Sequence, residues 1–167
     1  MSFANRVSQA LHEEHRATIA LMERLEQLIA RFRRSGPPNA TEAGIARLLS
    51  DLSTGVEAEV ARHFDFEEQQ LFPYLEAAGD AAIGAHLSEE HTVLRPLGAR
   101  LATLARQAAN GGFDQSAWSE FCRLGSELCE RMLAHVQKEE MALLPLLEES
   151  MDADTEMRLY EDYVASA

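Results

Sequence analysis

The stretch HVQKE, residues 135–139, decides the fold, because HFDFE at residues 63–67 repeats its His-x-x-x-Glu spacing 72 positions earlier. Residues four apart on an α-helix share a face and lie about 6 Å apart along the axis. A histidine and a glutamate with this spacing can therefore bind one small object from a single turn. The residues that follow also correspond, including a proline ten positions after each histidine, Pro73 and Pro145. Two copies of one pattern predict a shared metal centre.

Apolar residues recur at steps of three and four along four long segments, which is typical of amphipathic helices in a bundle. We predict these helices at about residues 2–34, 41–78, 87–108 and 116–149. A brief helical piece at 81–86 is expected to precede or join the third helix, and Ser116 is the expected N-cap of the fourth. Asp154 is expected to cap a short last helix over about 154–164. Pro73, Pro96 and Pro145 should each bend their helix, because proline lacks a backbone N–H.

The chain contains an internal duplication. The first and third segments superpose at an offset of 76 residues, which places His15 on His91, and the second and fourth superpose at an offset of 72. Each copy is a helical hairpin, and two hairpins joined by a short connection predict an all-α, up-down-up-down four-helix bundle. We expect one domain over residues 1–167, with the bundle core at about 2–149 and the C-terminal helix at about 154–164.

Six polar residues fall on the apolar faces of these helices and are the candidate metal ligands: His15, His63, Glu67, His91, His135 and Glu139. A single histidine on an apolar face is usually an ordinary core residue. Two buried glutamates need opposite charge nearby, however, and no lysine or arginine lies near them on these faces. Two divalent ions would supply that charge, with two histidines for each ion and both glutamates bridging. Iron, manganese or zinc suit such ligands, while the lack of thiolates disfavours a structural zinc site.

The composition narrows the partners and the compartment. The chain has 28 acidic and 15 basic side chains, a net charge of −13, which argues against nucleic acid and anionic membrane as partners. Cys122 and Cys129 are seven positions apart on one predicted helix, too far to form a disulfide with each other. With no signal peptide and no run of 18 apolar residues, we expect a soluble, cytoplasmic protein.

The sequence resembles the hemerythrin-like (HHE cation-binding) family over nearly its whole length. The motifs that carry the resemblance are Glu14-His15, His63-x-x-x-Glu67-Glu68 with Leu71-Phe72-Pro73, Glu90-His91, and His135-x-x-x-Glu139-Glu140 with Leu143-Leu144-Pro145. The resemblance implies a non-haem di-iron centre in a four-helix bundle, with carboxylate bridges and an oxo or hydroxo bridge. Manganese or zinc are the possible substitutes for iron.

The chain departs from the oxygen-carrying hemerythrins that it resembles. Those proteins use a fifth histidine four positions before the third-helix histidine, where this chain has Leu87. We expect the neighbouring His86 to lie on the surface. His12 is expected to be either a fifth ligand or a residue that contacts a ligand without binding the metal itself. The carriers' last carboxylate corresponds to Glu140, but the duplication favours Glu139. These differences disfavour reversible oxygen carriage.

These observations predict a non-haem di-iron protein that binds or senses a small molecule (oxygen, peroxide or nitric oxide) or iron. His15 and His63 would serve one iron, His91 and His135 the other, and Glu67 and Glu139 would bridge. The alternative is a di-iron enzyme of the stress response, which consumes peroxide or repairs iron–sulfur clusters. The repair proteins of the family carry an extra N-terminal cysteine-bearing domain that this sequence does not show, which disfavours that alternative. Whether the protein is an enzyme, and its oligomeric state, stay open.

Overall fold

The computed structural model describes residues 3–166, apart from the side chains of Glu57 and Glu59, and within this range all regular structure is helical. The predicted start of the first helix at residue 2 lies outside the described residues. The elements are α1 (Arg6–Phe32), α2 (Ala43–Phe66), η1 (Glu67–Leu71), α3 (Phe72–Ala77), α4 (Ala82–Gly111), α5 (Gln115–Lys138), η2 (Glu139–Leu143), α6 (Leu144–Ser150) and α7 (Ala153–Ala165). The predicted all-α class is confirmed.

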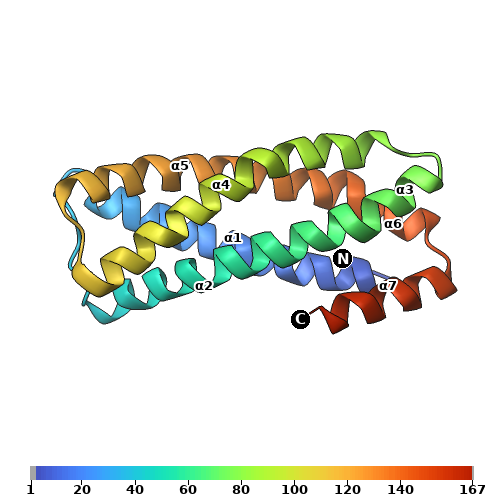
Figure 1. The fold of residues 1–167 in the computed structure, drawn as a ribbon, viewed down its shortest axis with the longest axis horizontal. Coiled ribbons are helices and arrows are strands. Elements are labelled where there is room, and N and C mark those ends of the chain that lie inside the picture. The colour runs from blue at the N-terminus through green and yellow to red at the C-terminus, as the bar shows by residue number, and fades with distance from the viewer. Residues whose placement is uncertain (1–2, 167) are drawn as a thin grey trace.

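Four long helices, α1, α2, α4 and α5, extend along the long axis of the molecule, and consecutive ones run in opposite directions (Figure 1). Contacts join α1 to α2, α2 to α4, α4 to α5 and α5 back to α1. The helices therefore form a bundle in which each one packs against two others. The short helix α7 folds back beside α1, near the N-terminus (Figure 1).

The helical piece predicted at 81–86 joins the third helix. The chain breaks at Gly79, whose φ of 97° suits glycine, and α4 begins at Ala82 and continues without interruption through Pro96. Two helix caps differ from the sequence-based expectations. The N-cap of α5 is Asp114 instead of Ser116, since the Asp114 side chain accepts a hydrogen bond from the Ala117 N–H at 2.7 Å. The N-cap of α7 is likewise Asp152 instead of Asp154.

Two π-helical turns, η1 and η2, replace the simple kinks predicted at Pro73 and Pro145. Each begins at the inward-facing glutamate of a His-x-x-x-Glu motif and ends just before the residue that precedes the proline. The N–H of Phe72 donates to the carbonyl of Glu67, five residues back, and Leu144 donates to Glu139 in the same way. The wider turn accommodates the proline without breaking the helix, and such turns are common at functional sites.

The apolar core consists of two clusters with a polar layer between them. The larger contains Met22, Val60, Leu94 and Met132, and the smaller contains Leu11, Leu71, Leu87 and Leu143. Along each long helix, the candidate ligands fall between a residue of one cluster and a residue of the other. The polar layer is thus enclosed by apolar side chains above and below.

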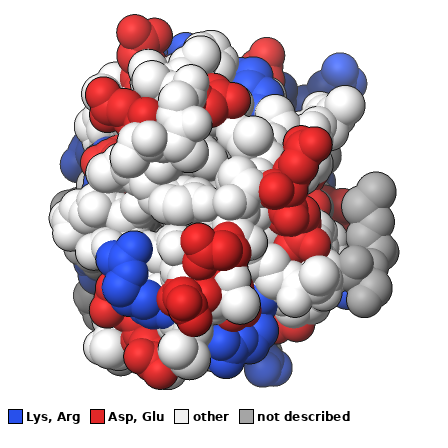
Figure 2. All heavy atoms as spheres, turned by 90° about the vertical axis from the view of Figure 1, so that its right-hand side faces the viewer, with Lys and Arg blue, Asp and Glu red and all other residues white. Residues whose placement is uncertain are grey.

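The surface carries the acidic excess of the sequence. Figure 2 shows the end of the bundle that α3, α6 and α7 approach, where groups of acidic side chains lie among uncharged ones and basic side chains lie at several separate places around the rim. No helix in the described range 3–166 combines the length and the apolar character needed to cross a membrane.

Candidate metal centre

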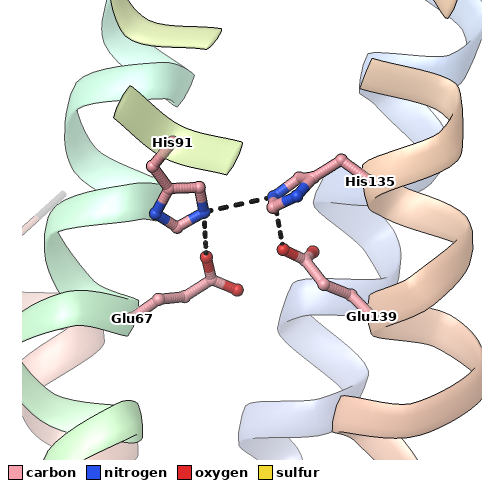
Figure 3. Close-up of side chains that lie close together, drawn as sticks. All are labelled: Glu67, His91, His135 and Glu139. Atoms are coloured by element: carbon pink, nitrogen blue, oxygen red, sulfur yellow. Dashed lines mark hydrogen bonds and ion pairs between the residues drawn. The ribbon is translucent and has the colours of Figure 1, made fainter. Parts of the chain in front are cut away.

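The structure brings all six candidate ligands together in the middle of the bundle. They come from four long helices and the two π-turns: His15 from α1, His63 from α2, Glu67 from η1, His91 from α4, His135 from α5 and Glu139 from η2. All six side chains are buried, and both glutamates are completely so. Figure 3 shows Glu67, His91, His135 and Glu139 pointing toward one another from facing helices.

The six residues divide into two groups that share Glu139. Ligand atoms of Glu67, His91, His135 and Glu139 all lie within 4.8 Å of one another, and so do those of His15, His63 and Glu139. Glu67 also reaches toward both groups, because its two oxygens lie 3.3 Å from His63 Nε2 and 3.3 Å from His91 Nε2. Either group could hold a metal ion, and both carboxylates are placed between the two.

The inner atoms of the cluster face one another without regular hydrogen bonds. The carboxylate oxygens of Glu67 and of Glu139 are fully buried, and their close polar neighbours are imidazole nitrogens, with 2.6 Å from Glu139 to Nε2 of both His15 and His135. The Nε2 atoms of His91 and His135 lie only 3.1 Å apart. Unsatisfied buried carboxylates are costly, and adjacent imidazole lone pairs repel each other. Cations bound between these atoms would remove both penalties, so the residues present fit a metal centre.

The other ring nitrogen of each histidine is fixed by a second set of glutamates. In every case an Nδ1–H donates to a carboxylate on a neighbouring helix. The four bonds are Glu14–His63 (2.7 Å), Glu68–His91 (2.7 Å), Glu90–His135 (2.8 Å) and Glu140–His15 (2.5 Å). This pattern selects the tautomer whose Nε2 faces the centre with a free lone pair, which is how metal-binding histidines are usually oriented.

These four bonds cross four different helix contacts: α1 to α2, α2 to α4, α4 to α5 and α5 to α1. Each long helix, with its π-turn where present, supplies one histidine and one of the outer glutamates. The bonds therefore close a ring around the bundle, which we call the Glu–His ring.

Each glutamate of the Glu–His ring is also held by a basic side chain from the same helix as its histidine. The contacts are Glu14 with Arg62, Glu68 with Arg95, Glu90 with Lys138 and Glu140 with His12. These basic residues lie toward the surface and compensate the charge of the outer carboxylates. They do not reach the two inner glutamates, whose charge remains for bound cations to balance.

The inner and outer groups perturb one another's pKa values. Burial lowers the pKa of His15, His63 and His135, but the surrounding carboxylates outweigh it and raise the pKa of all three. Burial would raise the pKa of Glu139, yet the three histidines around it hold that pKa well below the usual range. The pKa of Glu14 falls to about 2, because hydrogen bonds from His63 and Tyr163 outweigh the opposing effect of burial. Glu139 and Glu14 are thus ionised near neutral pH, and an ionised carboxylate at Glu139 is what metal binding requires.

A small cavity of about 30 Å³ adjoins one side of the cluster. It is bounded by apolar side chains of α1, α2 and α5 and by ligand candidates: Leu21, Met22, Val56, Val60, Phe64, Met132 and Val136, with Thr18, His15, His63, His135 and Glu139. Glu67 and His91 do not border it. The Phe64 ring instead stacks on His91, with 3.7 Å between ring centroids. A cavity of this size has room for one or two water-sized molecules.

The structure also places the residues whose roles the sequence left open. Glu140 points away from the inner cluster and bonds to His15 and His12, so Glu139 is the inner carboxylate. His12 contacts Glu140 and belongs to the outer shell of basic residues, not to the inner cluster. The side chain of His86 is 54% exposed, as expected for a surface residue, and Leu87 is buried in the apolar core.

Sequence reasoning missed the orienting role of Glu14, Glu68 and Glu90 and of Glu140. A signal was present, because Glu14 and Glu90 each directly precede a lone histidine, and Glu68 and Glu140 each directly follow an inner glutamate. The outer carboxylates are therefore duplicated together with the inner ones.

The fold and this cluster define the class: a helical bundle whose core contains histidines and glutamates of the kind that bind metal ions. A comparison with models of protein families matches residues 6–147 to the hemerythrin HHE cation binding domain. The match covers most of the chain, so this protein belongs to the hemerythrin HHE cation-binding family. A search of curated proteins found no significant match.

Proposed function

We propose that the protein binds two iron ions between its helices. His15 and His63 would hold one ion and His91 and His135 the other, with Glu67 and Glu139 bridging them. The observation that carries the proposal is the set of four fully buried carboxylate oxygens, which face the Nε2 atoms of four histidines whose Nδ1 atoms are all fixed from outside. The scaffold for such a centre is the up-down-up-down four-helix bundle of two hairpins predicted from the sequence.

Iron in this place would supply redox chemistry and open coordination positions, and an oxo or hydroxo bridge would balance the remaining positive charge. Two ions carry four positive charges against two inner carboxylates. The residues of the chain do the rest: the Glu–His ring orients the imidazoles, and the apolar clusters on both sides exclude water. Manganese or zinc could occupy the same ligands.

The cavity supports a small molecule as the partner of the centre. Its size suits oxygen, peroxide or nitric oxide, and its walls are mainly apolar. It borders His15 and His63, whereas Phe64 covers His91. We therefore propose that the protein binds or senses such a molecule on the side of His15 and His63, in a cytoplasmic setting.

Metal analysis tests the centre itself. Protein purified without oxygen should contain about two irons per chain. His63→Ala and Glu139→Ala should each lower this content to one or less, because each removes a ligand, and Glu23→Ala, at an exposed position of α1, should leave it unchanged. Less than one metal in the unchanged protein, or full metal content in both ligand variants, would refute the proposal.

Optical titration tests the ligand. The reduced protein should change its absorption on addition of oxygen, peroxide or nitric oxide. Full recovery of the starting spectrum after removal of the ligand indicates binding or sensing. Repeated consumption of the added molecule would instead favour the alternative, a di-iron enzyme that turns over peroxide.

A further inference from the structure

The C-terminal helix α7 lies outside the segment that matches the family, yet it reaches the surroundings of the metal ligands. The match ends at residue 147, whereas α7 spans Ala153–Ala165. The hydroxyl of Tyr163 on this helix donates a hydrogen bond to Glu14, and the other oxygen of Glu14 accepts the Nδ1–H of His63 at 2.7 Å. A continuous chain of contacts therefore leads from α7 to a candidate ligand.

Two sets of contacts fix α7 against the bundle. At its N-terminal half, Glu156 forms a bidentate salt bridge with Arg6, with distances of 2.8 and 3.0 Å, and Leu159 is buried in the smaller apolar cluster. At its C-terminal half, the ring of Tyr163 packs edge-on against Phe66, with 5.0 Å between centroids. Tyr163 is buried, with 7% of its surface exposed. The hydroxyl is thus held in place from both sides.

The two halves of the internal duplication differ in the group that holds the outer glutamate. In the second half of the chain, Glu90 orients His135 and is itself held by Lys138. The position equivalent to Lys138, at the offset of 72 residues, is Phe66, which carries no charge and cannot hold Glu14.

In the first half, two other groups perform this task. Arg62 and the Tyr163 hydroxyl both contact Glu14, and an Arg62 N–H also donates to the Tyr163 hydroxyl at 2.9 Å. Arg62 corresponds to Ala134 in the second half. Phe66, the counterpart of Lys138, is also the residue against which the Tyr163 ring packs. Glu14 is therefore held by a cation at a different position, Arg62, together with a hydroxyl that α7 supplies.

From this geometry we infer that Tyr163 is a positioning residue for the metal centre, and that docking of α7 and occupancy of the His15–His63 side are coupled. The inference rests on the proposed function. The Tyr163 hydroxyl fixes Glu14, Glu14 fixes the ring of His63, and the ring orientation determines how well Nε2 meets a metal ion. Loss of such an outer partner typically weakens metal affinity by about 10–100-fold. Coupling is reciprocal, so bound metal should in turn stabilise the docked helix.

A pair of single-oxygen changes on the same helix tests the inference. Tyr163→Phe removes only the hydroxyl that contacts Glu14 and keeps the ring against Phe66. Tyr160→Phe is the matched control, because its ring stacks with Arg6, 4.7 Å from the guanidinium carbon to the ring centroid, away from Glu14. Tyr163 acts through Glu14, which Arg62 still contacts in the variant, so the effect should be at the low end of this range. Anaerobic titration with Fe(II) against a competing chelator should show one of the two ions bound up to about tenfold more weakly in Tyr163→Phe. Tyr160→Phe should match the unchanged protein.

Hydrogen exchange of the unchanged protein provides a readout that needs no variant. The amides of α7 should exchange more slowly after Fe(II) is added, and this extra protection should shrink in Tyr163→Phe. The inference would be overturned if all three proteins bound Fe(II) with equal affinity, or if both variants lost affinity equally. It would also be overturned if the exchange rates of the α7 amides did not change on addition of Fe(II). If the unchanged protein binds no iron, the proposed function fails instead, so the two failures are distinguishable.

Discussion

Phe64 makes the two sides of the proposed centre unequal. Its ring covers His91 with nearly parallel planes, 10° apart, and meets His135 edge-on at 5.3 Å between centroids. His15, His63 and His135 border the cavity, whereas His91 does not. In the proposed centre, a molecule in the cavity would thus lie beside both histidines of the His15–His63 ion and only one histidine of the other ion. One aromatic side chain, placed one residue after His63, would make one ion easier to reach than the other.

Filling the cavity should block the ligand without removing the metal. Val60→Ile adds one methylene group at the cavity wall, in a space of about 30 Å³. One methylene in a closed apolar pocket changes binding by roughly tenfold or more, so nitric oxide affinity of the reduced protein should fall by about that factor. Val93→Ile, at a surface position, is the control. Unchanged affinity in Val60→Ile, with two irons still bound, would show that the ligand does not use this cavity.

The six inner residues could be predicted because the sequence shows both the helical spacing and the apolar face on which each of them falls. A histidine on an apolar stripe must face the core, and the duplication linked the two halves. The partners of the outer glutamates could not be predicted in the same way. Glu14 directly precedes His15 yet bonds to His63, because adjacent residues on a helix point about 100° apart. Which neighbouring helix a side chain meets depends on helix order and rotation, and neither follows from the spacing alone.

At the scale of elements, the π-turns were the main feature hidden from sequence reasoning. Pro73 and Pro145 indicate a disturbed helix, but proline is equally compatible with a kink, a break or a widened turn. The observed turns begin at Glu67 and Glu139, six residues before each proline. They present two successive glutamates to different partners, the first to the inner cluster and the second to a histidine of the Glu–His ring.

Helix caps show a similar limit. Asp114 and Ser116 are both good N-cap residues two positions apart, and so are Asp152 and Asp154. The first of each pair forms the cap in the structure. Composition identifies the region in which a helix begins, while the loop geometry that leads into it selects the residue.

The contact between α2 and α4 depends on a glycine. A Cβ atom at Gly98 would lie 2.9 Å from Cγ1 of Val56, which is closer than packed atoms normally approach. Gly98→Leu should therefore force the two helices apart and lower the free energy of unfolding by about 1–3 kcal/mol. Urea denaturation measures the change. Gly111→Leu, where a Cβ would meet nothing within 4 Å, should cost clearly less, and equal costs would contradict this account of the contact.

At the scale of the whole molecule, metal binding and folding should be linked. Removal of metal leaves two buried inner carboxylates balanced only by protonated histidines. A ligand present at about 1,000 times its Kd stabilises a protein by roughly 4 kcal/mol. A chain of this length gains about 2–4 °C in Tm per kcal/mol. Chelation should thus lower Tm by roughly 8–16 °C, measured by circular dichroism.

The pH dependence should have opposite signs with and without metal. The pKa values of His15, His63 and His135 are raised in the folded, metal-free protein. Their contribution to stability is complete below the unfolded value of about 6.5 and is lost as pH rises through the raised folded values. Metal requires neutral imidazoles, so the loaded protein should gain stability over the same range. A metal-free Tm that rises above pH 6.5 would contradict these protonation states.

The Glu–His ring has a consequence for how such a centre could originate. Two of its bonds lie within a hairpin, Glu14–His63 and Glu90–His135, and the other two join one hairpin to the other. Two identical hairpins related by a two-fold axis would complete the same circuit, so a half-length ancestor could have carried the whole centre as a dimer. Fusion into one chain then freed the halves to diverge. Phe66 and Lys138 occupy equivalent positions and differ, and Phe66 is the residue against which Tyr163 of the C-terminal helix packs.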